Sequence, residues 1–234
     1  GLEPRGFPVN LDAVGNMPCN PAIGGTGKGH LVRELDALGG EMARAADRAC
    51  IQYRLLNRGK GPAVWSLRAQ ADRRRYQEIM KHTLEQQERL WVKQAEITDI
   101  YAEGGRVTAV RTAYGAVYRV RAVVVASGTY LGGRTIVGDV TRSSGPDGLA
   151  AAFPLTESLT RLGLGLPRFK TGTPPRVNAR SVDFSQLEVQ PGDERVLPFS
   201  FETARPPDNQ AVCWLTYPTA PPHPLFRAHT TRAP

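Results

Sequence analysis

The chain has 234 residues, of which 41% are hydrophobic and 22% are charged, and this composition favours a folded domain with a buried core. Its longest apolar run, Ala122–Ala126, falls far short of the roughly 20 residues of a membrane-spanning helix, which speaks against a membrane protein. The formal net charge of +8 predicts either a polyanionic partner such as nucleic acid or simply a basic, solvated surface.

Residues 1–18 have little periodicity and are expected to form a loop, and a glycine-rich turn follows at residues 19–30. Three leucines then recur at helical spacing and predict a helix that Gly39-Gly40 interrupts. These leucines are Leu31, Leu35 and Leu38. A second helix is expected from about Arg68 to Gln87, with many positive charges on its solvent-facing side.

After Leu90 the hydrophobic period changes from helical to alternating, which predicts short strands in an antiparallel meander. The expected strands are Leu90–Gln94, Ile97–Tyr101, Val107–Thr112 and Val117–Val120. The meander leads into Val123–Ala126, which is apolar on both faces and predicts a fully buried, parallel strand. This order of elements indicates an α/β sheet with an antiparallel excursion.

The second half of the chain is rich in Gly and Pro. One helix is expected from about Thr156 to Leu162, and Lys170–Arg176 is expected to be a rigid loop that either holds a phosphate or carboxylate or crosses between domains. Strand-like pieces follow at Leu197–Phe201 and Val212–Thr216.

The turn around Gly24–Lys28 fails both common phosphate-binding motifs. A P-loop needs a glycine where Ala22 stands and Ser or Thr where Gly29 stands, so a nucleotide triphosphatase is excluded. The dinucleotide fingerprint needs a glycine at Val32. The segment is still a glycine-rich helix start with a positive charge at Lys28. It either contacts the anionic or polar edge of a cofactor or has glycines only because the turn is tight.

Three cysteines, widely spaced, form no CxxC motif or Cys/His cluster, so no metal site is predicted. Their number is odd, and the first residues of the given sequence lack the apolar segment of a secretory signal. Both observations predict a location in the reducing cytoplasm. Cys19 lies just before the glycine-rich turn and is interpreted either as a thiol activated by the helix start or as a small buried residue. Gly128 and Thr129 follow the expected buried strand, where a ligand can approach the backbone or where the chain simply leaves the sheet.

Together these stretches resemble the GidA/MnmG family of tRNA uridine-modifying flavoproteins, and the resemblance spans nearly the whole chain. It is carried by Asn10–Gly15, Cys19–Gly25, Gly27–Val32, Asp36–Gly40, Lys60–Val64, Arg68–Asp72, Gly128–Leu131, Lys170–Arg176 and Pro198–Phe201. The block Cys19–Leu31 is the most specific of these. The family begins with a strand, a GxGxxG turn and a helix that this sequence does not contain, and it continues past Pro234, so the chain is expected to be an internal fragment.

The resemblance implies a partial FAD-binding domain of the glutathione-reductase type, a doubly wound sheet with a meander, over residues 1–175. The start of an inserted NADH-binding domain is implied over residues 176–234. The residues implied to line the FAD site are Asn20, Pro21, Gly24, Gly25, Gly27, Lys28, Glu96, Gly128 and Thr129, with Glu96 near the adenine end. Cys19 matches a cysteine near the flavin and is the candidate catalytic residue.

The resemblance also implies a reaction. With a GTPase partner, the family adds a (carboxymethyl)aminomethyl group at C5 of the wobble uridine of tRNA, with NADH as reductant and a folate as one-carbon donor. It further implies a cytoplasmic homodimer without a membrane anchor. The fragment alone is expected to be inactive and to bind FAD weakly or not at all. The alternatives are a basic RNA-binding or interaction module, suggested by Arg73–Arg75, and a non-functional truncated product.

Overall fold

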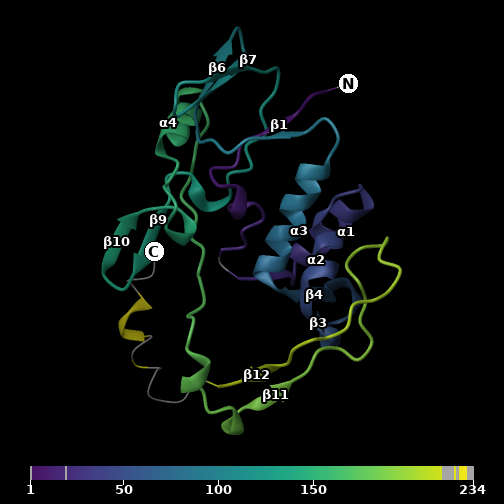
Figure 1. Ribbon diagram of the computed structural model, residues 1–234. Helices are drawn as coiled ribbons and strands as arrows, with labels where there is room; N and C mark the ends of the chain where they lie inside the picture. Colours follow the sequence, from purple (N-terminus) through teal and green to yellow (C-terminus); the bar gives the residue numbers. More distant parts are fainter. Residues whose placement is uncertain (1, 19, 218–223, 225–226, 231–234) are drawn as a thin grey trace. The chain divides into compact units, whose positions relative to one another are not determined.

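The computed structural model describes residues 2–18, 20–217, 224 and 227–230, and these described residues form two compact units (Figure 1). Unit 1 is built from residues 1–18 and 81–169, and unit 2 from residues 19–80 and 170–234. Each unit is therefore made of two segments that are distant in the sequence. The expected functional division at residue 175 stays a prediction.

Unit 1 contains short sheets, helix α4 and the end of helix α3 (Arg73–Gln86). Its elements are β1 Arg5–Gly6, β5 Trp91–Val92, β6 Ile97–Glu103, β7 Arg106–Thr112, β8 Val117–Arg119, β9 Arg134–Val137, β10 Val140–Ser143 and α4 Phe153–Arg161. Strands β6, β7 and β8 form the predicted antiparallel meander, β9 and β10 form a hairpin, and β1 pairs with β5 in parallel. Gly104 and Gly105 join β6 to β7 with φ of 56° and 75°, the left-handed geometry that a two-residue hairpin turn needs.

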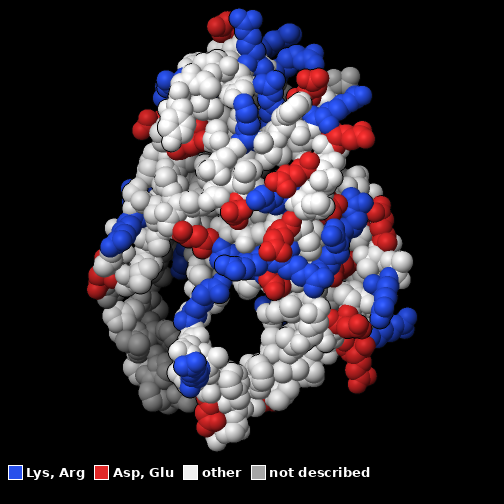
Figure 2. Space-filling model, viewed as in Figure 1, with Lys and Arg blue, Asp and Glu red and all other residues white. Residues whose placement is uncertain are grey.

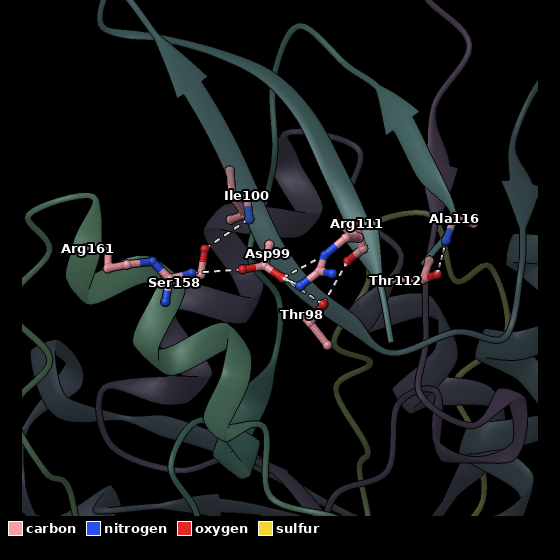
Figure 3. A network of polar contacts seen from close by, with 8 residues as sticks. All are labelled: Thr98, Asp99, Ile100, Arg111, Thr112, Ala116, Ser158 and Arg161. Atoms are coloured by element: carbon pink, nitrogen blue, oxygen red, sulfur yellow. Dashed lines mark hydrogen bonds and ion pairs between the residues drawn. The ribbon is translucent and has the colours of Figure 1, made fainter. Parts of the chain in front are cut away.

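The core of unit 1 lies between the meander and α4. Ile100, Val110 and Leu159 form its buried centre. The Ser158 hydroxyl accepts a hydrogen bond from the Ile100 backbone N–H at 2.9 Å, and this contact fixes α4 on β6 (Figure 3). Asp99 lies beside it at the surface and accepts hydrogen bonds from Arg111 at 2.7 Å and Arg161 at 2.8 Å. The Arg111 guanidinium holds the pKa of the Asp99 carboxyl below its usual range.

Unit 2 contains a three-stranded antiparallel sheet covered by helices. Its elements are β2 Ala22–Gly24, α1 Lys28–Ala37, α2 Met42–Ala49, β3 Cys50–Leu56, β4 Ser66–Ala71, the first part of α3 Arg73–Gln86, β11 Glu188–Gln190 and β12 Cys213–Leu215. The strand order is β2-β4-β3, and β11 pairs with β12. Short 3-10 helices are found in both units, at Leu11–Ala13, Arg58–Lys60, Pro62–Val64, Gly128–Tyr130, Pro146–Gly148, Ala179–Ser181 and Phe184–Gln186.

Helix α2 is largely buried in unit 2. Four alanines on it are buried, which lets the helix lie close to its neighbours because a methyl group occupies little space. The buried alanines are Ala43, Ala45, Ala46 and Ala49. The outer edge of β3 is covered by the returning segment 190–211, in which Asn209 accepts a hydrogen bond from the Tyr53 N–H at 2.7 Å and Asp193 accepts one from Leu55 at 2.6 Å. This edge strand is therefore not left with unpaired donors there.

The expected α/β class, the meander and the helices at 28–49 and 153–161 are confirmed. Three local predictions are wrong. Residues 123–126 form no strand, and Val124 is 91% exposed, because no described strand lies beside this segment to pair with it. Residues 68–71 belong to strand β4 rather than to the helix, which begins at Arg73. Residues 197–201 form a turn held by side chains rather than a strand.

The leucine spacing predicted α1 correctly but not its buried face. Leu31, Leu35 and Leu38 are all exposed, whereas Gly29 and Val32 are the buried residues of this helix.

Strands β2, β3 and β4 were not predicted. In β4 the buried Leu67, Ala69 and Ala71 do alternate with polar residues, but this short segment runs directly into the helical pattern of α3, so the pattern predicts it as the start of that helix. The pairing of the three strands joins segments separated by turns and one-turn helices.

Candidate functional site

The glycine-rich turn starts as a strand and ends as a helix. Residues Ala22–Gly24 pair with β4, and the chain then turns into α1 through Gly25 and Gly27, whose φ values are 90° and 81°. The Gly25 N–H donates to the Leu67 carbonyl at 2.9 Å, and the Gly29 N–H donates to the Gly25 carbonyl at 2.8 Å. The turn is therefore fixed by backbone hydrogen bonds to the sheet and within itself. We call residues 20–28 the glycine loop.

The glycines of this loop serve two different purposes. A Cβ on Gly24 would fall well inside contact distance of the Leu67 carbonyl oxygen and 2.6 Å from Phe199 Cζ, so Gly24 is needed for close packing. A Cβ on Gly25 or Gly27 would meet no atom within 4 Å. At these two positions the absent side chain leaves open space beside the backbone, where a ligand can approach.

Lys28 contacts the glycine loop itself. Its Nζ donates a hydrogen bond to the Ala22 carbonyl at 3.0 Å. The neighbouring Thr26 hydroxyl accepts a hydrogen bond from the Asn57 amide at 2.8 Å. Both contacts brace the loop, so Lys28 has a structural role here in addition to the cationic charge that the sequence indicated.

A buried carboxylate holds a distant segment against the back of the loop. Asp47 on α2 is only 6% exposed, and its oxygens accept hydrogen bonds from the Tyr53 hydroxyl, the Phe199 N–H at 2.8 Å, the Ser200 N–H at 3.0 Å and the Thr203 hydroxyl at 2.5 Å. Phe199 is fully buried and lies against Gly24. By holding the Phe199 backbone, Asp47 fixes the side chain that packs against the glycine loop. A buried carboxylate with this many donors is well compensated for its loss of water.

Helix α1 holds the same segment from its other side. Arg33 donates to the Pro198 carbonyl at 2.7 Å and to the Phe199 carbonyl at 2.9 Å, and its guanidinium lies 4.2 Å from the centre of the Phe201 ring. Asp36 accepts a hydrogen bond from the Phe201 N–H at 2.8 Å. We call residues 198–203 the supporting turn. Sequence reasoning missed its role, although the block Pro198–Phe201 was recognised as a motif.

Burial shifts the pKa values of several groups in unit 2. Burial raises the pKa of the Cys50 thiol to about 12, so it stays protonated near neutral pH and is no nucleophile. Burial, and then the hydrogen bond to Asp47, raise the pKa of Tyr53 far above its ordinary value. Burial raises the pKa of Tyr76 to about 12. Cys19, the candidate catalytic residue, lies outside the described residues.

The other candidate residues are divided between the two units. Six lie in the glycine loop of unit 2: Asn20, Pro21, Gly24, Gly25, Gly27 and Lys28. Three lie in unit 1: Glu96, Gly128 and Thr129. The Glu96 carbonyl accepts a hydrogen bond from the Ala113 N–H at 2.9 Å, and Gly128 and Thr129 are exposed in the 3-10 turn Gly128–Tyr130.

Two hollows of the described surface bear on the candidate residues and their surroundings. One, of about 530 Å³, is lined by Pro21, Asp72, Arg73, Arg74, Gln77 and Arg176, all in unit 2. The other, of about 340 Å³, follows the β9–β10 hairpin and is lined by Thr135, Val137, Val140 and Arg142, none of them a candidate residue. Within the described part of the chain, no group of three or more His, Cys, Asp and Glu side chains is placed to hold a metal ion.

Comparison with known proteins places this geometry in a family. The family model described as glucose-inhibited division protein A matches residues 7–234. The chain is 56% identical, over its whole length, to a protein of Caldicellulosiruptor saccharolyticus named tRNA uridine 5-carboxymethylaminomethyl modification enzyme MnmG. It is 52% identical over 226 residues to the protein of the same name from Heliobacterium modesticaldum.

A solved structure agrees with the fold. The structure of Aquifex aeolicus GidA in its form I crystal superimposes with a TM-score of 0.91 at 45% sequence identity, over 97% of this chain and 39% of that one. The chain spans 37% and 36% of the length of the two named relatives. Among the helices that the structure describes, none is both long and apolar enough to cross a bilayer.

Proposed function

The chain belongs to the glucose-inhibited division protein A family, and we propose that it is part of a flavin-dependent enzyme that modifies uridine in tRNA. Relatives at 50–56% identity carry the name tRNA uridine 5-carboxymethylaminomethyl modification enzyme, and the flavin is proposed from family resemblance. The observation that carries the proposal is the glycine loop, in which two glycines with positive φ leave open space beside a rigidly held backbone.

The glycine loop fits one wall of a flavin site. Gly25 and Gly27 let a planar or phosphorylated group reach the backbone, and the exposed side chain of Asn20 supplies polar groups at the rim. The start of α1 adds the partial positive charge of a helix N-terminus, which favours a pyrophosphate. When bound, FAD would supply the redox chemistry, and the protein's part is to position it.

The second set of residues in this proposal is in unit 1. The backbone around Glu96 is proposed to contact the adenine end of FAD, and Gly128 and Thr129 to approach the cofactor from an exposed turn. Gly128 has a φ of 57° and open space at its Cβ position, as Gly25 and Gly27 do. Cys19 stays the proposed catalytic residue on family resemblance alone.

The finer steps of the reaction are also proposals. We propose that the modification is a (carboxymethyl)aminomethyl group at C5 of the wobble uridine, with NADH as reductant and a folate as one-carbon donor. A GTPase is the proposed protein partner, a homodimer the proposed assembly of the whole enzyme, and the cytoplasm the proposed location. Residues 176–234 are proposed to start the NADH-binding domain.

Titration of the 234-residue chain with FAD, followed by quenching of flavin fluorescence, tests the glycine loop. We expect binding weaker than micromolar, because the sequence contains no GxGxxG fingerprint. Valine at Gly25 or Gly27 should abolish it by filling the open space. The control is Gly105→Val, which puts valine at another positive-φ glycine, in the β6–β7 turn.

The outcome separates a direct contact of the glycine loop with FAD from a general loss of folding. If the wild type binds FAD measurably, an equal affinity of Gly25→Val would remove the glycine loop from the flavin site. A loss of binding in the Gly105→Val control of the same size would show a general effect of unfolding instead. Circular dichroism of each variant distinguishes these cases.

A further inference from the structure

The 530 Å³ hollow of unit 2 brings together two basic motifs that lie far apart in the sequence. Arg73, Arg74 and Gln77 come from the start of α3, and Arg176 comes from the end of the loop 170–176. Pro21 of the glycine loop closes the same hollow. Each basic motif had two interpretations from its sequence alone, and their convergence at one hollow favours a binding site over two unrelated solvated segments.

The hollow is strongly positive. Three arginines and one carboxylate line it. The carboxylate, Asp72, caps α3 by accepting a hydrogen bond from the Arg75 N–H at 3.1 Å, so one of its oxygens is committed to the helix start. Arg74 and Arg176 are exposed and able to reach a ligand. Figure 2 shows Lys and Arg side chains gathered over the part of the molecule where α3 begins.

The chemistry of the lining selects a phosphate. A guanidinium presents donors in a planar fork that matches two phosphate oxygens, and arginines from two segments bind one group from two directions. The amide of Gln77 and the exposed side chain of Arg74 add donors suited to a phosphodiester or its ribose. A cationic ligand would be repelled, and a purely apolar one would leave the guanidinium groups without hydrogen-bond acceptors.

We propose that this hollow binds a phosphodiester of the RNA backbone, with Arg74 and Arg176 as the principal contacts. This inference rests on the proposed function, in which tRNA is the substrate and therefore the polyanion that would bind here. Pro21, at the start of the glycine loop, lines the hollow, and its carbonyl is fixed by a hydrogen bond from the Ala71 N–H at 2.8 Å. A phosphate held here would lie beside the loop proposed to hold the flavin.

The test measures binding of fluorescein-labelled tRNA to the 234-residue chain by anisotropy across a series of salt concentrations. The double variant Arg74→Gln/Arg176→Gln should weaken binding on the order of tenfold at low salt. It should also make the plot of log affinity against log salt shallower by about one unit of slope, because one phosphate contact is lost. The matched control is Arg106→Gln/Arg119→Gln, which removes two exposed arginines from the meander of unit 1.

Each outcome has a separate meaning. Loss of affinity and slope in the Arg74/Arg176 variant but not in the control supports the proposal. Equal losses in both variants, or none, overturn it, because the contribution would then be that of net charge alone. Reduced FAD affinity with unchanged tRNA affinity would also overturn it and assign the hollow to the cofactor. A wild-type chain that binds no tRNA would count against the proposed function itself.

Discussion

The two units each contain a carboxylate with several hydrogen-bond partners, but the two carboxylates are used in opposite ways. In unit 1, Asp99 lies near the surface between two arginines, Arg111 and Arg161. In unit 2, Asp47 is buried and has uncharged partners, two hydroxyls and two backbone N–H groups. The first arrangement is an ion-pair cluster of a half-buried carboxylate with two exposed arginines, and the second is a buried carboxylate that holds a distant segment by hydrogen bonds.

This difference predicts which unit depends on a single residue. An exposed ion pair contributes little because water and salt screen it. A buried carboxylate that loses its charge leaves several donors without an acceptor, each at a considerable cost in free energy. Unit 2, which carries the glycine loop, should therefore be the more sensitive of the two to point substitutions.

The largest effect is expected at Gly24. Alanine there would have to adopt a φ of 99° and would collide with the Leu67 carbonyl and the Phe199 ring. We expect a loss of about 4 kcal/mol in the free energy of unfolding, from backbone strain and overpacking together. Urea denaturation followed by circular dichroism measures it.

Gly25→Ala is the matched control for this prediction. Its φ of 90° is equally unfavourable for alanine, but its Cβ would meet no atom within 4 Å. The loss should be about 1 to 2 kcal/mol, which is the strain alone. Equal losses at the two positions would show that Phe199 does not pack against the loop.

The next largest effect compares the two carboxylates directly. Asp47→Asn should reduce the free energy of unfolding by about 3 kcal/mol, because the amide cannot accept from all four donors. Asp99→Asn should cost about 1 kcal/mol or less. The same denaturation assay measures both, and a larger loss for Asp99→Asn would reverse the contrast between the units.

A smaller effect tests the link between α4 and the meander. Ser158→Ala removes the acceptor of the buried Ile100 N–H and should cost about 1 to 2 kcal/mol. Thr160→Ala, on the exposed side of the same helix, should cost less than about 0.5 kcal/mol. Hydrogen exchange at the Ile100 amide should accelerate only in the Ser158 variant, and protection that is unchanged there would rule out this contact.

The smallest effect is a pH dependence. The folded pKa of Asp99 is lowered, so its stabilising contribution is present above the ordinary carboxyl pKa of 3.8 and is lost as the pH falls through the folded value. The difference in unfolding free energy between the wild type and Asp99→Asn should be less than about 1 kcal/mol at pH 7 and should shrink below pH 3.8. A difference that stays constant on acidification would contradict the arginine pairing.

The meander of unit 1 was predictable because its determinants are local. Alternating apolar residues and the pair Gly104-Gly105 specify a hairpin within a few residues. The apolar run 123–126 was wrongly predicted to be a buried strand, because the determinants of such a strand are not local. Burial of a strand depends on neighbouring strands, and no described strand accompanies this one.

The glycine loop was predictable, but what supports it was not. Closely spaced glycines before a helical period mark such a turn in any sequence. Nothing in the sequence near Asp47 indicates that it is buried, since an aspartate among alanines in a helix is usually at the surface. Its partner Phe199 lies 152 positions away, and only the folded chain brings the two together.

That separation has a consequence for biosynthesis. On the ribosome, Asp47 emerges long before Phe199, and at about 5 to 20 residues per second the interval is on the order of 8 to 30 seconds. During this time α1, α2 and the glycine loop exist without the supporting turn, and the contact between Asp47 and that turn, being one of high sequence separation, is slow to form. Nascent unit 2 should therefore expose apolar surface that a chaperone can recognise, and slow codons between residues 50 and 198 should lengthen that exposure.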